Sequence, residues 1–197
     1  GLIAASVCKA LKKELSPAGT ATQYFYNPAN SLISHNDALA NTTAYSYDSY
    51  QNLISKQDAL LKTTQFAYDA QNRRTQEITS LGRTTSWEYD LDGNISKRID
   101  ANGNITNYVY DSLDRLTTII YPDGRQASFS YDDRGNVISL ADAAGTGTYS
   151  YDGFDRLTQT TNTYGQRLAY SYDQIGKLKT LAYPDNKLVA YDYDARN

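Results

Sequence analysis

The sequence is poor in the residues with which globular proteins usually fill a core or build an active site. Its 197 residues include no methionine, one cysteine, one tryptophan and one histidine. The single cysteine, Cys8, excludes an internal disulfide framework. With His35 as the only histidine, a Ser-His or Cys-His catalytic device lacks supporting residues. We therefore expect no catalytic, metal or cofactor site and no enzyme.

Long apolar runs and strong charge are also missing. The apolar start of the chain is interrupted by lysines from Lys9 onward, which excludes a membrane span and the order of a signal peptide. The net charge of −3 is mild, with acids and bases interspersed. This pattern argues against a nucleic-acid surface and against membrane insertion.

Tyrosine is abundant instead, with 19 copies, and it marks an internal repeat. A Tyr-Asp pair recurs every 21 residues from Tyr47 to Tyr193, with one spacing of 20 between Tyr131 and Tyr151. We number this tyrosine position 1. The position-1 tyrosines are Tyr26 (followed by Asn), Tyr47, Tyr68, Tyr89, Tyr110, Tyr131, Tyr151, Tyr172 and Tyr193. Position 20, two residues before the next tyrosine, is always aromatic and includes Trp87, Tyr108, Phe129, Tyr149, Tyr170 and Tyr191.

Each unit is predicted to contain two short strands and two turns, because its aromatics alternate with small residues at a period of two. An Asp at the start of a type I turn accepts the backbone N–H two residues on, and Gly, Asn or Asp tolerates the left-handed conformation that closes the turn. The predicted first-turn aspartates are Asp48, Asp69, Asp90, Asp111, Asp132, Asp152 and Asp173. The predicted second-turn glycines, at position 15, are Gly82, Gly103, Gly124, Gly145 and Gly165.

The faces of the strands follow from the turn lengths. A three-residue first loop with a bulge would place position 1 opposite the mostly aliphatic position 7. Carrying this register through the second turn requires either a different loop length or one bulge per repeat, and the residues leave both open. Arg74 replaces the aliphatic at position 7, so we expect the repeat of Tyr68 to be irregular.

The fold expected is all-β, with tandem 21-residue hairpins forming a curled or spiralling antiparallel sheet. We expect residues 1–15 to be a degenerate leading segment. Residues 16–197 are then one array of about eight complete repeats with partial repeats at both ends. Because the chain stops inside a repeat, we expect a fragment of a longer protein, with unpaired strand edges that favour self-association.

The repeats resemble those of a known family. Segments such as YDSLDRLT (110–117), YDGFDRLT (151–158) and YDDRGNV (131–137) are similar to the YD repeat of bacterial Rhs proteins. The same repeat occurs in the C component of insecticidal toxin complexes, in wall-associated proteins and in teneurins. This resemblance implies a hollow β-shell that encloses a C-terminal toxin, in a secreted or cell-surface and bacterial setting. The partners implied are the rest of the parent shell and the enclosed toxin domain.

An alternative of a different class is an extracellular adhesion or carbohydrate-binding module that uses the aromatic face, since tyrosines stack on sugar rings. The aromatics at fixed positions favour packing between hairpins over ligand binding. Two other features, the single histidine and an aspartate-rich segment, are interpreted as structural. His35, at position 10, is expected to be a partly solvated strand residue, and DLDGN at 90–94 is expected to be a plain turn rather than a calcium loop.

Overall fold

The regular structure is entirely β-strand, which confirms the all-β prediction. The computed structural model describes residues 10–15 and 21–194, and within these residues there is no helix. Accordingly, no helix in the described part of the chain could span a membrane. The strands alternate with short turns, and every strand pairing with a defined register is antiparallel.

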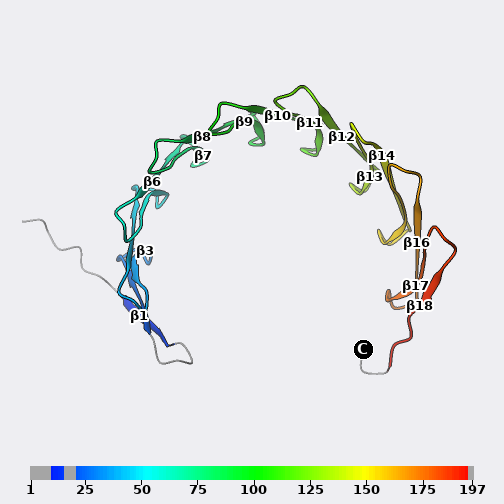
Figure 1. Ribbon diagram of the computed structural model, residues 1–197, viewed down its shortest axis with the longest axis horizontal. Helices are drawn as coiled ribbons and strands as arrows, with labels where there is room; N and C mark the ends of the chain where they lie inside the picture. Colours follow the sequence, from blue (N-terminus) through cyan, green and yellow to red (C-terminus); the bar gives the residue numbers. More distant parts are fainter. Residues whose placement is uncertain (1–9, 16–20, 195–197) are drawn as a thin grey trace, which may run out of the picture. The chain divides into compact units, whose positions relative to one another are not determined.

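The chain divides into two compact units, each a series of hairpins in chain order (Figure 1). Unit 1 comprises Gly1–Glu88 and Arg98–Asn104, and unit 2 comprises Tyr89–Lys97 and Ile105–Asn197, so β9 (Ile95–Ile99) lies at the division. The strands of unit 1 are β1 (Ala10–Leu15), β2 (Ala21–Tyr26), β3 (Leu32–Asn36), β4 (Thr42–Tyr47), β5 (Leu53–Gln57), β6 (Thr63–Tyr68), β7 (Arg74–Ile78) and β8 (Thr84–Tyr89). Those of unit 2 are β10 (Ile105–Tyr110), β11 (Leu116–Ile120), β12 (Gln126–Tyr131), β13 (Val137–Asp142), β14 (Gly145–Tyr151), β15 (Leu157–Thr161), β16 (Arg167–Tyr172), β17 (Leu178–Ala182) and β18 (Leu188–Ala190).

Strand β1 lies inside the segment for which the sequence indicates no clear repeat. It pairs antiparallel with β2, with Ala10 opposite Tyr26 and Leu15 opposite Ala21. The hairpin pattern therefore begins before Ser16. Cys8 lies outside the described residues.

Position 1 lies opposite position 7 in every repeat whose register is defined, as predicted. In β12 and β13, Tyr131 pairs with Val137 and Phe129 pairs with Leu140, with a register shift between Ser130 and Tyr131. The same shift recurs in the first hairpin of the six other repeats whose register is defined. One bulge per repeat is therefore the device that keeps the faces constant, and it settles the choice that the sequence leaves open.

Arg74 does not disturb this geometry. It lies opposite Tyr68, the partner that an aliphatic position-7 residue has elsewhere, and the bulge falls at the equivalent place. The expectation that this repeat is irregular is wrong for the backbone. The hydrogen bonds between β6 and β7 join main-chain groups, so the arginine side chain does not change the register.

Both turns of the repeat have the same closure, a hydrogen bond from the N–H of a left-handed residue to the carbonyl three residues earlier. In the first turn of the Tyr110 repeat, the N–H of Asp114 donates to the carbonyl of Asp111 at 3.1 Å, and Asp114 has φ 58°. In the second turn, the N–H of Gly124 donates to the carbonyl of Tyr121 at 2.9 Å, with φ 81°. Leu61 occupies the same position as Gly124 with φ 60°, a conformation unfavourable for a residue with a Cβ.

The repeat with 20-residue spacing differs at its second turn. Asp142 pairs directly with Gly145 across the two-residue turn Ala143–Ala144. Gly145 has φ 129°, and a Cβ there would lie 3.1 Å from Cβ of Thr163. One residue fewer thus brings this turn close to the neighbouring one.

The sheet in each unit has two different faces and almost no buried interior. We call the face that carries positions 1, 7, 10, 18 and 20 the aromatic face, and the opposite one the polar face. The pairs Ser128–Ala141 and Ser130–Ser139 illustrate the small residues of the polar face. Among residues 22–194, only Ala127, at position 18, is buried, with 5% exposure. The side chains of the aromatic face are half-buried against one another, and this layer takes the place of a core.

Candidate functional site: the aromatic face and its turns

The position-1 tyrosines use their hydroxyls as well as their rings. The hydroxyl of Tyr131 donates to the carbonyl of Leu116 at 2.7 Å. The ladder between β11 and β12 covers only residues 118–120 and 126–128, so the Leu116 carbonyl lies beyond its end. The same bond, from 2.8 to 3.1 Å, joins further position-1 tyrosines to position 7 of the preceding repeat: Tyr47, Tyr68, Tyr110, Tyr151, Tyr172 and Tyr193. Phenylalanine would leave this half-buried acceptor without its partner.

The position-10 residue lies between the position-20 aromatics of successive repeats. His35 is the best example, with its ring centroid 5.9 Å from that of Tyr24 and 6.0 Å from that of Tyr45. The Tyr45 hydroxyl is also 3.3 Å from Nδ1 of His35. The histidine is thus a half-buried strand residue in a stack of rings.

In the Tyr68 repeat, it is the guanidinium of the position-7 residue Arg74 that contacts the position-20 aromatics of two successive repeats. Its guanidinium carbon lies 4.6 Å from the ring centroid of Trp87 and 5.7 Å from that of Phe66. Its Nη1 lies 3.3 Å from a carboxylate oxygen of Glu77, the position-10 residue. Cation–π attraction and this ion pair replace the aromatic–aliphatic contact of the other repeats.

The first-turn aspartates bind the backbone of their own turns. Oδ1 of Asp132 accepts the N–H groups of Arg134 at 3.0 Å and Asn136 at 2.9 Å, and Oδ2 accepts the Asn136 side-chain amide at 3.1 Å. The side-chain hydrogen bond from Asn136 is the largest influence on the pKa of Asp132, which lies below its ordinary value of 3.8. Oδ1 accepts equivalent N–H groups in Asp48, Asp69, Asp90, Asp111, Asp152 and Asp173.

In the Tyr110 and Tyr151 repeats, the arginine at position 6 links one repeat to the next. Arg115 donates from Nε to Oδ2 of Asp111 at 2.8 Å and from Nη1 to the carbonyl of Asp132 at 3.0 Å. Its guanidinium carbon also lies 4.7 Å from the ring centroid of Tyr131. Arg156 repeats this arrangement with Asp152, Tyr172 and Asp173.

Sequence reasoning missed this contact, which we call the arginine clasp. A signal was available, because arginine or asparagine recurs four residues after the turn Asp. The bond from the arginine to the following repeat has no such signal, because it depends on the relative position of neighbouring hairpins.

The segment DLDGN closes a turn in the manner of the other repeats. Oδ1 of Asp90 accepts the N–H groups of Asp92, Gly93 and Asn94 at 3.1, 2.8 and 2.8 Å. Oδ1 of Asp100 likewise accepts the N–H of Asn102 and of Asn104. Within residues 10–15 and 21–194, no group of three or more His, Cys, Asp or Glu side chains is placed to hold a metal ion.

Comparison with known proteins identifies a matching repeat family. The family model of the RHS repeat matches residues 47–85, 89–126 and 131–167, which together exceed half of the chain. Among curated proteins, no significant match is found.

Solved toxin structures share the fold. The structure of TcdB2-TccC3 without its hypervariable C-terminal region is 18% identical, with a TM-score of 0.67, over 93% of this chain and 12% of that one. TcdB2-TccC3-Cdc42 is 19% identical, with a TM-score of 0.64, over 90% and 11% of the two chains. The Tc holotoxin pore of Photorhabdus luminescens, with a TccC3 mutation, is 18% identical, with a TM-score of 0.63, over 90% and 11%. The chain thus spans about an eighth of the length of the toxin chains that it matches.

Proposed function

This chain belongs to the RHS repeat family, and on that premise we propose that it is a wall segment of a larger secreted shell that encloses a C-terminal toxin or other protein cargo. The observation that carries the proposal is the repeated bond from the position-1 tyrosine to the preceding repeat. A bond of this kind in nearly every unit fits a continuous wall, in which each hairpin is fastened to its neighbour.

The structure of the turns supports a structural role rather than catalysis. The carboxylates that recur in the sequence accept backbone N–H groups of their own turns, as Asp48, Asp111 and Asp152 do. Groups engaged in this way are poorly placed to act as general acids or bases. We therefore propose that the chain has no enzymatic activity of its own.

The matched structures support the enclosed cargo and the setting. One is described as TcdB2-TccC3 without a hypervariable C-terminal region, a second contains Cdc42, and a third is a bacterial toxin pore. By analogy, the partners of this chain are the remainder of its shell and a protein inside it, and its location is extracellular. No nucleic-acid or membrane partner is part of the proposal.

Protease protection tests the enclosure. The parent protein that contains this chain is treated with a protease that cuts the proposed cargo, and the same cargo is treated alone. We expect cleavage in the parent to be at least about tenfold slower, because opening of the wall must precede it. Equal cleavage rates in a folded parent would contradict the enclosure.

An outward-facing adhesive surface is the less favoured function. The rings around His35 are half-buried in contact with each other, which suits packing between repeats rather than an open platform.

A further inference from the structure

The first turns carry a sequence pattern that extends over two repeats. Position 6 alternates between asparagine and arginine, and position 5 of the following repeat alternates between a side-chain acceptor and glycine. The alternating position-6 residues, in chain order, are Asn52, Arg73, Asn94, Arg115, Asn136 and Arg156. The position-5 residues of the repeats that follow them are Asn72, Gly93, Asp114, Gly135, Asp155 and Gly176. Asparagine thus precedes a repeat with Asn or Asp, and arginine precedes a repeat with glycine.

Asparagine at position 6 bonds to the position-5 side chain of the next repeat. The Asn136 amide donates to Oδ1 of Asp155 at 2.9 Å and to Oδ2 of Asp132, in its own turn, at 3.1 Å. The two donor groups of one amide are therefore shared between its own turn and the next. The same bond between repeats recurs, at 2.8 and 2.9 Å, in two other pairs: Asn52 with Asn72, and Asn94 with Asp114.

The arginine clasp reaches the main chain of the next repeat instead of a side chain. Nη1 of Arg115 donates to the carbonyl of Asp132 at 3.0 Å, and the same carbonyl accepts the N–H of Gly135 at 3.1 Å. In the corresponding pair of repeats, a Cβ on Gly176 would already be in van der Waals contact with Nη1 of Arg156, at 3.8 Å. Glycine at position 5 therefore leaves the space beside the guanidinium clear.

The two positions are matched in length. Arginine is long and meets glycine, whereas asparagine is shorter and meets a side chain that extends from the other turn. Ser31, at position 6 of the Tyr26 repeat, is shorter still, and its hydroxyl donates to Oε1 of the longer Gln51 at 2.6 Å. Counted in atoms beyond Cα, the two side chains together have the same length in all three kinds of pair. A substitution at one position alone would leave either a gap or a crowded contact.

The main chain at position 5 also differs between the two kinds of turn. The angle φ is 93° at Gly135 and 90° at Gly176, whereas it is 61° at Asn72, 58° at Asp114 and 60° at Asp155. Residues with a Cβ favour the smaller angle when they are left-handed, and the larger one suits glycine. The two kinds of turn therefore differ in backbone shape as well as in the side chain that they present to the preceding repeat.

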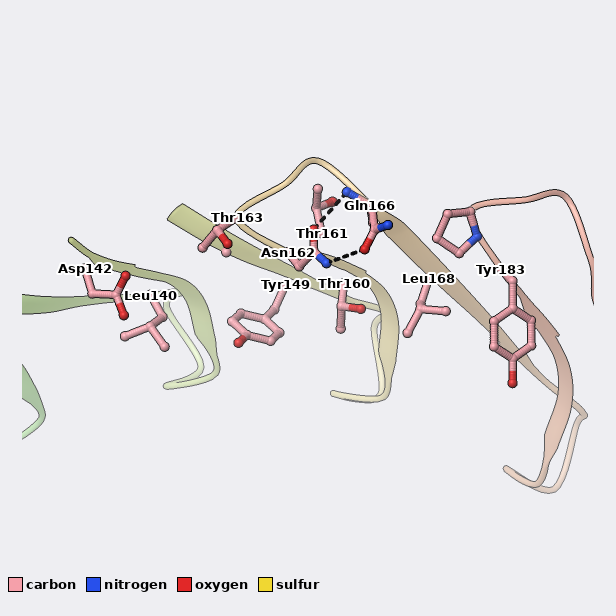
Figure 2. A pocket seen from close by; sticks show the side chains of 12 residues that line it. Leu140, Asp142, Tyr149, Thr160, Thr161, Asn162, Thr163, Gln166, Leu168 and Tyr183 are labelled. Carbon is pink, nitrogen blue, oxygen red and sulfur yellow. Dashed lines mark hydrogen bonds between the residues drawn. The ribbon is translucent and has the colours of Figure 1, made fainter. Parts of the chain in front are cut away.

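The second turns provide a contrast, because their side chains bond within one turn. The Asn162 amide donates to Oε1 of Gln166 at 2.9 Å, and Oδ1 of Asn162 accepts the backbone N–H of Gln166 at 2.9 Å (Figure 2). The Asn104 amide likewise donates to Oδ2 of Asp100 at 2.9 Å. The amides of the first turns bind the next repeat in addition to their own turn. Selection between neighbouring repeats therefore belongs to the first turns.

We propose that the first turns are selective interfaces between repeats. A turn with asparagine at position 6 fits a neighbour with Asn or Asp at position 5, and a turn with arginine fits a neighbour with glycine. Two repeats are then the smallest unit that can be added to the array without a mismatch. A hairpin that skipped one neighbour would meet a turn of the wrong kind, which opposes misassembly among units of similar sequence. This selectivity belongs to the repeats themselves and does not rest on an enclosed cargo.

A double-mutant cycle at Asn52 and Asn72 tests the proposal. Asn52→Arg and Asn72→Gly each create a mismatch, and together they convert an asparagine pair into an arginine–glycine pair. Urea denaturation of the full 197-residue chain gives the equilibrium constant for unfolding of the wild type and the three variants. We expect the constant of the double variant to be about fivefold smaller than the two single effects predict. The preference of a left-handed residue for glycine cancels in this comparison.

Asn52→Arg combined with Leu61→Gly is the matched control. Leu61 is also left-handed, with φ 60°, but it lies in the second turn of the same repeat. The effects of these two substitutions should combine to within about twofold of their product. If the coupling between Asn52→Arg and Asn72→Gly is no larger than in this control, or has the opposite sign, the first turns do not select their neighbours and the proposal is wrong.

Removal of one repeat gives an independent test. Deletion of residues 110–130 keeps the faces of the strands but places Asn94 before the turn of Gly135. Gly135→Asp supplies an acceptor for Asn94 in this shortened chain, whereas in the full chain it creates a mismatch with Arg115. We expect Gly135→Asp to raise the unfolding constant about fivefold more in the full chain than in the shortened one. An equal effect in both chains would overturn the proposal, and if the shortened chain does not fold, the cycle at Asn52 decides.

Discussion

At the scale of single residues, the choice of tyrosine over phenylalanine at position 1 has a physical reason. The ring fills the aromatic face, and the hydroxyl satisfies a carbonyl at which the strand ladder has already ended, as Tyr131 does for Leu116. Position 20 has no such requirement, and there Phe66 and Phe129 stand beside tyrosines. Position 1 therefore requires a ring with a hydroxyl, whereas position 20 requires only an aromatic ring.

Removal of one hydroxyl should show this difference. Tyr131→Phe is expected to lower the free energy of unfolding by about 1 kcal/mol, because the Leu116 carbonyl loses its donor. Urea denaturation measures the change. The control is Tyr170→Phe, at position 20, which should change stability by less than about 0.5 kcal/mol. Equal effects of the two substitutions would show that the hydroxyl has no special role.

The left-handed residues give a second residue-scale prediction. Leu61 has φ 60° and a side chain that is 76% exposed, so it gains little from packing. Leu61→Gly should raise the free energy of unfolding by about 1 kcal/mol. Gly124→Ala, at the same repeat position, should lower it by a similar amount. Thermal unfolding measures the change in stability of both variants. Changes of the same sign would contradict the prediction.

At the scale of the hairpin, much of the structure could be predicted from sequence. The 21-residue spacing, the alternating aromatics and the turn aspartates predicted the strand order and the pairing of Tyr131 with Val137. Strand β1 was not predicted, because ALKKEL lacks the aromatic pattern. The bulge was left open, since a shift of one residue in the main chain has no side-chain signature.

Side-chain contacts between repeats were less predictable. The clasp of Arg115 on Tyr131 and the stack of His35 between two tyrosines join residues from different hairpins. Composition at positions 6 and 10 is variable, so neither contact follows from the consensus of the repeat.

An insertion tests how strictly the hairpin specifies its faces. One alanine inserted between Ser128 and Phe129 would reverse the side chains on one side of it in β12 and should cost more than about 2 kcal/mol. One alanine between Gly153 and Phe154, at an exposed turn, should cost less. The urea midpoints of the two variants give the comparison, and similar losses would contradict a specified face.

At the scale of the whole molecule, the turn aspartates should act together in acid. The pKa values of Asp48, Asp132 and Asp152 are lowered from 3.8, chiefly by side-chain hydrogen bonds from Asn52, Asn136 and Arg156. The unfolded chain therefore takes up protons at a higher pH than the folded chain does. The stability from these groups is complete above the unfolded value and is lost as pH falls through the folded values.

We expect the urea midpoint to be constant from about pH 7 to pH 5 and to fall steadily below about pH 4. Asp132→Asn keeps a turn-forming side chain without a titrating group, so it should make the decline shallower. A midpoint that stays level to pH 3 would exclude a stabilising role for these carboxylates.

Strand edges should govern association of the isolated chain. Strand β18 is short and exposed, and within the described residues its paired neighbour is β17 alone. We expect scattering mass to rise with concentration and Leu188→Lys to reduce that rise, because an edge charge opposes pairing. Leu113→Lys is the control, since Leu113 is 67% exposed at a turn and Leu188 is 64% exposed at the edge. A monomer at every concentration would contradict the prediction.

The bulge beside each position-1 tyrosine also bears on how such arrays change length during evolution. Because it restores the same face after every unit, duplication or loss of a whole repeat by recombination leaves all remaining side chains on their original sides. A frame of this kind tolerates copy-number variation while it resists single-residue slippage within strands. The number of repeats in such an array can therefore change while the sequence of each remaining repeat stays the same.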